Sequence, residues 1–185
     1  MEVDSRPAGS PLYLTRIASF VAVGLVAGLA LAAVPNVELV TAVCFGAGFL
    51  LGPAAGLLTG ALTETLFAGF HPMGSSFGLL LLAQVAGMSA AGALGAVAAK
   101  MGRVENKIRY RVSVVGMGIL ATVFFDLVTN LTFPLAAGFS RRQTIISLGL
   151  AVPFAVTHLV SNIAVFSLLV VPILPKLKKV MSATT

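Results

Sequence analysis

The sequence has little of what a soluble globular protein usually carries. Only 10% of its 185 residues are charged, whereas a typical soluble domain has about 25%. Tryptophan is absent, and the single cysteine, Cys44, stands inside an apolar segment, so disulfides play no part. Hydrophobic residues make up 58% of the chain. The shortage of charge indicates that most of the chain lies in lipid, and six spans of about 20 residues use up its length.

Several functional classes lack their motifs. There is no Walker motif, so an ATPase would have to be a separate chain. The two histidines, His71 and His158, stand on different segments and do not make a convincing haem or metal site, and no Ser, His and Asp spacing suggests hydrolysis. The net charge of +6 does not indicate nucleic-acid binding, because the basic residues stand in short blocks beside apolar runs. We therefore expect no enzyme, no cofactor and no metal.

The apolar runs and their breaks predict an all-α membrane protein with a bundle of six transmembrane helices. Proline disfavours helical backbone in the residue before it, and it fits the first turn of a new helix. The predicted helices cover residues 13–34, 37–51, 53–70, 77–100, 112–133 and 144–171. Asn36 is predicted to cap the second helix, and Gly52-Pro53 and Pro134 are predicted to break the chain between helices. The last helix is predicted to bend at Pro153 and to end at Pro172 and Pro175. Residues 1–12 are expected to be a disordered lead, residues 13–175 one domain, and residues 176–185 a basic cytoplasmic tail.

The basic residues predict the orientation of the bundle. With six spans, ten of the twelve Lys and Arg residues fall on the side of the termini, five of them in the segment Lys100–Arg111. The opposite side holds Arg141 and Arg142. Positive residues mark the cytoplasmic side of a membrane protein. Both termini are therefore predicted to be cytoplasmic, in a multi-pass protein of a prokaryotic cell membrane.

The segment Gly52–Glu64 combines close packing with a buried polar group. Gly52, Gly56 and Gly60 follow one another at four-residue intervals, so they form one broad stripe on a helix. Helices in lipid pack closely along such stripes of small residues. Glu64 continues the stripe into apolar sequence, where an ionisable side chain usually faces a cavity or a partner. A structural alternative is a carboxylate that is hydrogen-bonded for stability alone.

Polar side chains gather towards the outer half of the predicted bundle. Asp126 and Asn130 are four residues apart, as are His158 and Asn162, so each pair shares a helix face. The predicted substrate-binding residues are Asn36, Glu38, Glu64, His71, Gln84, Asp126, Asn130, His158 and Asn162. The inner half of each helix is nearly free of such groups. This asymmetry favours a pocket that opens to the outside over a continuous polar channel.

Structural alternatives remain for most of these residues. Glu38 could favour a helix N-terminus electrostatically, and Gln84 and Asn130 could join helices by hydrogen bonds. His158 and Asn162 could be satisfied core residues, and His71 could be solvated in its turn. Asp126 is the hardest to dismiss, because it is deep and follows two phenylalanines. Apolar walls could come from Phe67, Phe70, Phe77, Phe125 and Phe133.

The sequence resembles a known family of membrane proteins. The resemblance is carried by two segments, PNVELVT after the first helix and GFLLGPAAGLLTGALTE, which follows it. With these segments the chain resembles the substrate-binding S component of energy-coupling factor (ECF) transporters. The resemblance implies high-affinity capture of a vitamin or related micronutrient from outside. It also implies a transmembrane coupling protein and two cytoplasmic ATPase subunits as partners, with the coupling protein contacting an Ala-xxx-Ala pattern that Ala18 and Ala22 match.

The resemblance leaves the substrate open. Without tryptophan, the stacked ring of some family members is excluded. The carboxylates of Glu38, Glu64 and Asp126 would favour a substrate with amine, amide or hydroxyl donors. A cobalamin precursor, a pyrimidine or thiamine-related compound, or another small nutrient would all fit. The competing function is a stand-alone ion-coupled secondary transporter or channel, and a membrane enzyme or assembly factor is a third reading. Ala18 and Ala22 could equally pack inside the bundle.

Overall fold

A computed structural model describes residues 9–102 and 106–183. Across these two ranges it contains helices and turns but no strand, which confirms the all-α class. The elements are α1 (Pro11–Leu31), α2 (Val40–Leu51), α3 (Pro53–Gly69), α4 (Gly78–Met101), α5 (Lys107–Ala136), α6 (Arg141–Val165), the π-helical segment η1 (Phe166–Val170) and α7 (Val171–Ala183).

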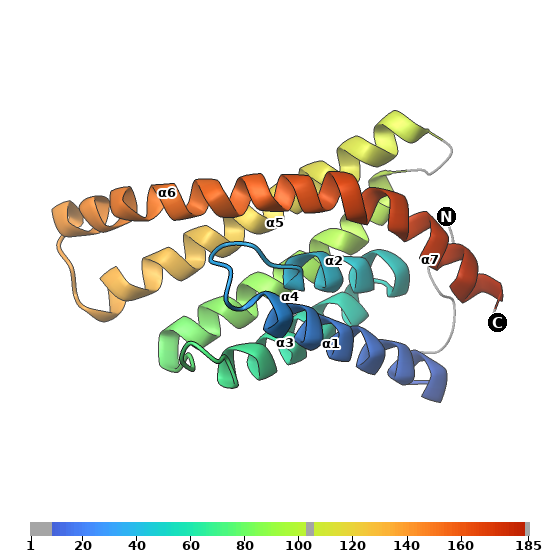
Figure 1. Ribbon diagram of the computed structural model, residues 1–185, viewed down its shortest axis with the longest axis horizontal. Coiled ribbons are helices and arrows are strands. Elements are labelled where there is room, and N and C mark those ends of the chain that lie inside the picture. The colour runs from blue at the N-terminus through green and yellow to red at the C-terminus, as the bar shows by residue number, and fades with distance from the viewer. Residues whose placement is uncertain (1–8, 103–105, 184–185) are drawn as a thin grey trace.

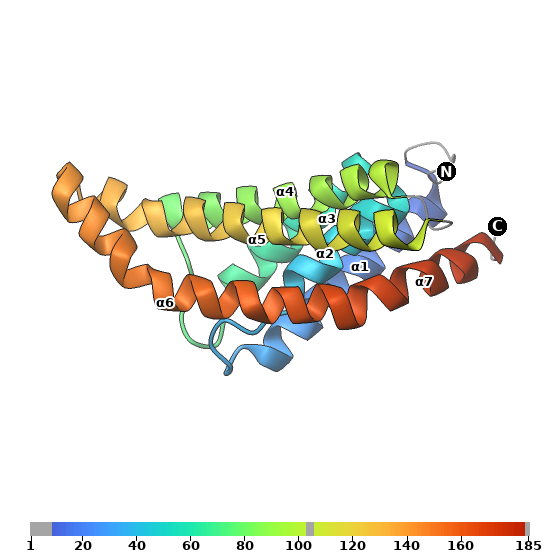
Figure 2. The same ribbon diagram turned by 90° about the horizontal axis from the view of Figure 1, so that it is seen from above.

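The helices form an elongated bundle in which the chain reverses at each connection (Figure 1). The start of α1, the turn between α2 and α3, the start of α5 and all of α7 lie at one end, which we call the terminal end. The connections after α1, α3 and α5 point the other way, towards the loop end, where the hairpin of α5 and α6 extends furthest (Figures 1 and 2).

Four helical stretches are long and apolar enough to cross a membrane. They are Pro11–Leu31, Gly78–Met101, Lys107–Ala136 and the continuous stretch Arg141–Ala183 that joins α6, η1 and α7. Helix α2 is apolar but has only 12 residues, which is about 18 Å at a rise of 1.5 Å per residue. Large apolar side chains cover much of the surface of these helices. This composition is consistent with a membrane protein.

The first two helices begin at other residues than predicted. Helix α1 starts at Pro11, because Ser10 caps it by accepting a hydrogen bond from the backbone N–H of Tyr13 (3.3 Å). The predicted lead is therefore shorter than residues 1–12, and residues 1–8 lie outside the described range. Asn36 does not cap the second helix: it has a left-handed φ of 59°, and α2 begins only at Val40.

Three prolines lie inside helices instead of ending them. Pro134 is in the last turn of α5, and the N–H of Phe139 closes this end by donating to the Pro134 carbonyl (2.9 Å). Pro172 is the second residue of α7, just past the π-helical segment η1, in the continuous stretch that joins α6, η1 and α7. The helix then continues past Pro175 to Ala183, so the predicted basic tail is largely helical. Figure 2 shows α6 changing direction in the half that contains Pro153, as expected.

The basic segments are also more helical than predicted. Lys107 begins α5, and Asn106 caps this helix by accepting from the backbone N–H of Arg109 (3.0 Å). The predicted connection Lys100–Arg111 is therefore largely helix, with residues 103–105 outside the described range. At the loop end, Arg141 and Arg142 open α6 behind a capping box of Ser140 and Gln143.

Glycines bring α2, α3 and α4 into backbone contact. A Cβ atom at Gly56 would meet the carbonyl of Gly92 on α4, and one at Gly60 would meet the carbonyl of Met88. Gly48 on α2 lies against Gly92 in the same way. Two of the three predicted stripe glycines thus pack against α4, as small residues do in membrane helices. Gly52 has another role: its φ of 97° lets the chain turn between α2 and α3.

The core differs between the two ends. The larger apolar cluster includes Tyr13, Phe45, Tyr110, Phe166 and Leu174, and it draws on the terminal-end parts of α1 to α5, on η1 and on α7. A much smaller cluster of Val40, Cys44 and Met88 adjoins the polar residues of the other half. The confirmed burial of Cys44 agrees with its reading as a small apolar residue.

Candidate functional site

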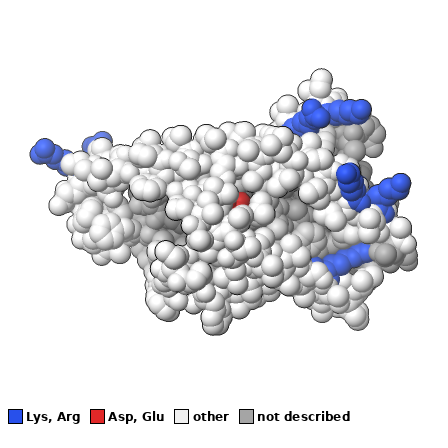
Figure 3. All heavy atoms as spheres, in the orientation of Figure 1, with Lys and Arg blue, Asp and Glu red and all other residues white. Residues whose placement is uncertain are grey.

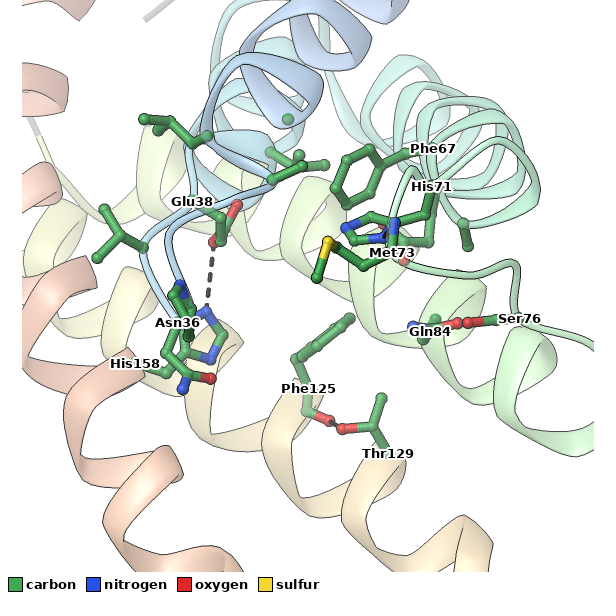
Figure 4. Close-up of a pocket in the computed structure, with 18 of the residues that line it drawn as sticks. Asn36, Glu38, Phe67, His71, Met73, Ser76, Gln84, Phe125, Thr129 and His158 are labelled. Carbon is green, nitrogen blue, oxygen red and sulfur yellow. Dashed lines mark hydrogen bonds and ion pairs between the residues drawn. The ribbon is translucent and has the colours of Figure 1, made fainter.

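The loop-end half of the bundle contains a cavity of about 580 Å³. It lies beneath the segment after α1 and the loop after α3, and α3, α4, α5 and α6 supply its walls. Figure 4 shows Glu38 and His158 on one side of an open centre, with Phe67, His71 and Met73 opposite. Ligand pockets typically measure about 300–1,000 Å³. The cavity is therefore large enough for one small organic molecule.

Glu38 stands just before α2 and has two roles. Its Oε2 accepts a hydrogen bond from the backbone N–H of Thr41 (2.8 Å), which stabilises the start of α2. Its Oε1 accepts from the side-chain amide of Asn162 (3.2 Å) and lies 3.4 Å from Nε2 of His158. One carboxylate therefore both stabilises the start of α2 and belongs to the polar residues of the cavity.

His158 on α6 connects the polar residues of three segments. Its Nδ1 lies 2.7 Å from Oδ1 of Asp126 on α5, and its Nε2 lies 2.9 Å from the amide nitrogen of Asn162. A ring that carries its proton on Nδ1 donates to Asp126 and accepts from Asn162. Asp126, His158, Asn162 and Glu38 thus form one network, which joins α5, α6 and the segment before α2.

Glu64 and Gln84 form the open part of the site. Glu64 on α3 is 2% exposed, yet its Oε2 has no hydrogen-bond partner within the described residues. Oε1 of Gln84 on α4 is also buried without a partner. Leaving such an atom unsatisfied costs about 1–3 kcal/mol. Both side chains line the cavity, so a hydrogen-bond donor placed there could satisfy them.

Apolar side chains complete the walls. Phe67 on α3 meets His71 edge to face with ring centres 4.9 Å apart, and Phe125 on α5 meets His158 in the same manner at 6.0 Å. Met88 and the loop residue Met73 add flexible apolar surface. The cavity therefore offers aromatic surface for a ring and polar groups that fix its orientation, as is usual in binding sites.

Eight of the nine residues predicted to bind substrate line this one cavity. They are Asn36, Glu38, Glu64, His71, Gln84, Asp126, Asn130 and His158. The ninth, Asn162, is 1% exposed behind the cavity wall, where its amide bonds to Glu38. The side-chain amide of Asn130 donates to the backbone carbonyl of Asp126 (2.7 Å), so part of its role is local. Contact of these residues with a substrate stays a prediction.

The aromatic prediction holds in part, and some residues of the site went unpredicted. Phe67 and Phe125 line the cavity, whereas Phe70, Phe77 and Phe133 are mostly exposed. The sequence reading missed Ser76, Met73, Met88 and Thr129 as lining residues. Thr129 could have been found, because it stands three residues after Asp126 and therefore shares its helix face.

The small residues of α1 divide between two faces. Ala18 and Ala22 are exposed, so packing inside the bundle is not their role. Gly24 and Gly28 are buried on the other face, where added Cβ atoms would meet Thr63 and Phe67. The exposed pair leaves a surface that a neighbouring helix could approach closely.

The ring of His158 is held on both sides. Its Nδ1 faces the Asp126 carboxylate, and its Nε2 faces the amide of Asn162. Within the described ranges, no group of three His, Cys, Asp or Glu side chains is placed to hold a metal ion. Comparison of the chain with protein-family models, curated proteins and solved structures finds no match.

Proposed function

We propose that this protein is the membrane-embedded, substrate-binding S component of an ATP-driven ECF-type importer. It would capture a vitamin or related micronutrient from outside a prokaryotic cell and deliver it inward with a coupling protein and two ATPase subunits. The observation that carries the proposal is the convergence of eight predicted polar residues on one cavity in the loop-end half. The sequence resemblance adds the transport mechanism and the partners.

The proposal includes the orientation of the bundle. Figure 3 shows Lys and Arg side chains at the two ends of the visible face, most of them at the terminal end. Under the positive-inside rule the terminal end is then cytoplasmic and the cavity faces outward. Six crossings require α2 and α3 to count as spans. The short α2 would do so with the segment 32–39, which carries the chain from α1 to its start.

The alternative is a secondary transporter that works alone. Such a carrier needs a polar route to the cytoplasm, as well as an outer site. The terminal-end half is instead filled by buried apolar side chains such as Phe45 and Phe166. This packing favours a binding subunit that needs a coupling protein to complete transport.

Transport by a reconstituted system tests the proposal. Proteoliposomes that contain this protein should take up one vitamin-like compound only when a coupling protein, the ATPases and ATP are present. Uptake driven by an ion gradient without these partners would contradict the proposal and support the secondary transporter.

The exposed pair on α1 gives a test of partner contact. Replacing Ala18 and Ala22 by leucine should block assembly with the coupling protein and leave substrate affinity intact, because both side chains point away from the bundle. Ala86→Leu, at an exposed position of α4, is the matched control. Normal assembly of the double variant in a pull-down would remove Ala18 and Ala22 from the contact.

A further inference from the structure

The cavity lining has more acidic than basic side chains. Three carboxylates line it, those of Glu38, Glu64 and Asp126, and its lining contains neither lysine nor arginine. His158 lies between two of them, and His71 is the other histidine of the lining, so even two doubly protonated rings would offset only two of the three carboxylates. The cations visible in Figure 3 stand towards the ends of the molecule, away from the middle. Buried charge of this kind normally has a partner of opposite sign.

The three carboxylates differ in the number of hydrogen-bond partners that the protein gives them. Glu38 has the Thr41 backbone and the Asn162 amide as partners, and Asp126 has the His158 ring. Glu64 is almost fully buried and its Oε2 has none within the described chain. Other buried side-chain oxygens without a partner in the described chain belong to Thr59, Thr63 and Asn162. Of the residues with such an oxygen, only Glu64 and Gln84, on neighbouring helices, line the cavity.

From these observations we infer that the cavity binds an organic cation with N–H donors, such as an ammonium, amidinium or aminated heteroaromatic group. Glu64 supplies the opposite charge and accepts one N–H, and Gln84 accepts another. Phe67 and Phe125 line the same cavity and can present the negative faces of their rings to the cation. An anionic ligand would meet like charge from three side chains, and a neutral ligand would leave the excess charge in place.

This inference rests on the proposed function for the statement that the ligand is a solute captured from outside. Beyond that function, the inference names the charge of the substrate and the two residues, Glu64 and Gln84, that recognise the substrate. The Glu38–His158–Asp126 network then shapes the opposite wall, and it leaves fewer acceptors free for the ligand.

Three probes of nearly the same shape test the charge preference. Benzamidine is a planar cation at neutral pH, benzamide is its neutral counterpart, and benzoate is an anion. Their binding to the purified protein in detergent is measured by calorimetry and by the shift in melting temperature. Benzamidine should bind at least tenfold more tightly than benzamide, and benzoate should not bind. Equal binding of the three, or no benzamidine binding at millimolar concentration, overturns the inference.

Variants then assign the preference to Glu64. Glu64→Gln keeps the shape of the side chain and removes its charge, so benzamidine affinity should fall at least tenfold while benzamide affinity changes less than threefold. Thr65→Val, on the exposed face of the same helix, is the matched control and should change neither. If Glu64→Gln still prefers benzamidine over benzamide as strongly as the unsubstituted protein does, the role of Glu64 is overturned. If Glu64→Gln misfolds, the binding of the three probes to the unsubstituted protein still decides the charge preference.

The inference and the proposed function can fail separately. Tight binding of a neutral or anionic vitamin by a protein that assembles with the ATPases would overturn the cationic class and keep the importer. A cation-selective cavity in a protein that never assembles with a coupling protein would do the reverse.

Discussion

The two halves of the bundle treat buried polar groups differently. In the terminal-end half, the hydroxyl of Tyr110 donates to the carbonyl of Val171 (2.8 Å), so this buried polar group is satisfied within the protein. In the loop-end half, Glu64 is also deeply buried, but its Oε2 lies beside a cavity and has no hydrogen-bond partner among the described residues. The protein therefore satisfies the Tyr110 hydroxyl by itself, whereas it leaves an acceptor of Glu64 open to the cavity.

The same helices serve both halves. Helix α5 contributes Tyr110 and Val114 to the apolar core, and some three turns later it contributes Asp126 to the cavity. Helix α2 changes along its length in the same way, from Val40 at the cavity to Phe45 and Phe49 in the apolar core. If this division is correct, substitutions in one half should change stability without changing binding, and substitutions in the other should do the opposite.

The largest effect is expected in the apolar half. Phe45 is fully buried and meets Phe166 edge to face with ring centres 5.0 Å apart. Phe45→Ala should lower the free energy of unfolding by about 3–5 kcal/mol through the lost transfer energy and the new cavity. Reversible unfolding in mixed detergent micelles measures this. Ligand affinity of the folded fraction should stay within threefold, and a larger loss would show that the halves are coupled.

A second test concerns the glycine contact at the middle of the bundle. Gly92→Ala places a methyl group against the backbone of Gly56, and backbone cannot yield as a side chain can. We expect a loss of about 1–3 kcal/mol in the free energy of unfolding. Gly116→Ala is the control, because its Cβ would meet open space. It should be neutral or stabilising by up to about 1 kcal/mol, and equal losses in both variants would argue against the packing role.

In the polar half, Asp126→Asn should act mainly on binding. The substitution keeps the volume of the side chain and removes the charge that faces Nδ1 of His158. Substrate affinity should fall at least tenfold, or about 1.4 kcal/mol, in a calorimetric titration. Full affinity in both this variant and Glu64→Ala would mean that the cavity is not the binding site.

The smallest effect is expected at the loop end of α3, where two phenylalanines can be compared. Phe67 lines the cavity, whereas Phe70 is 74% exposed. Phe67→Ala should weaken substrate binding by about 0.5–1.5 kcal/mol, the typical value of an aromatic contact. Phe70→Ala should leave the affinity unchanged. A similar loss in both variants would indicate a general change at the loop end of α3 in place of a lost wall contact.

The prolines show where sequence reasoning about the fold was weakest. A proline predicts a break, because it removes an intrahelical hydrogen bond and its ring crowds the preceding turn. The helices nevertheless include Pro134 in α5 and both Pro172 and Pro175 in α7. No local pattern of residues predicted the π-helical segment η1, which ends two residues before Pro172.

The polar site was easier to predict than the helix ends. Apolar sequence makes each carboxylate or amide conspicuous, and spacing of four residues places Asp126 with Asn130 and His158 with Asn162 on common faces. Spacing within a helix says nothing about its rotation relative to other helices. The contacts of His158 with Asp126 and Glu38 therefore could not be predicted, nor could the missing partner of Glu64.

The sequence by itself determined that this chain is helical and apolar, and that the polar residues in and beside its apolar segments gather in one half. These properties follow from composition and from residue order along single helices. Only the tertiary structure decided that eight of these polar residues share one cavity, that Ala18 and Ala22 face outward, and that Oε2 of Glu64 has no partner among the described residues. The reason is that these facts depend on how separate helices are rotated and packed, and backbone contacts such as that of Gly56 with Gly92 fix this packing.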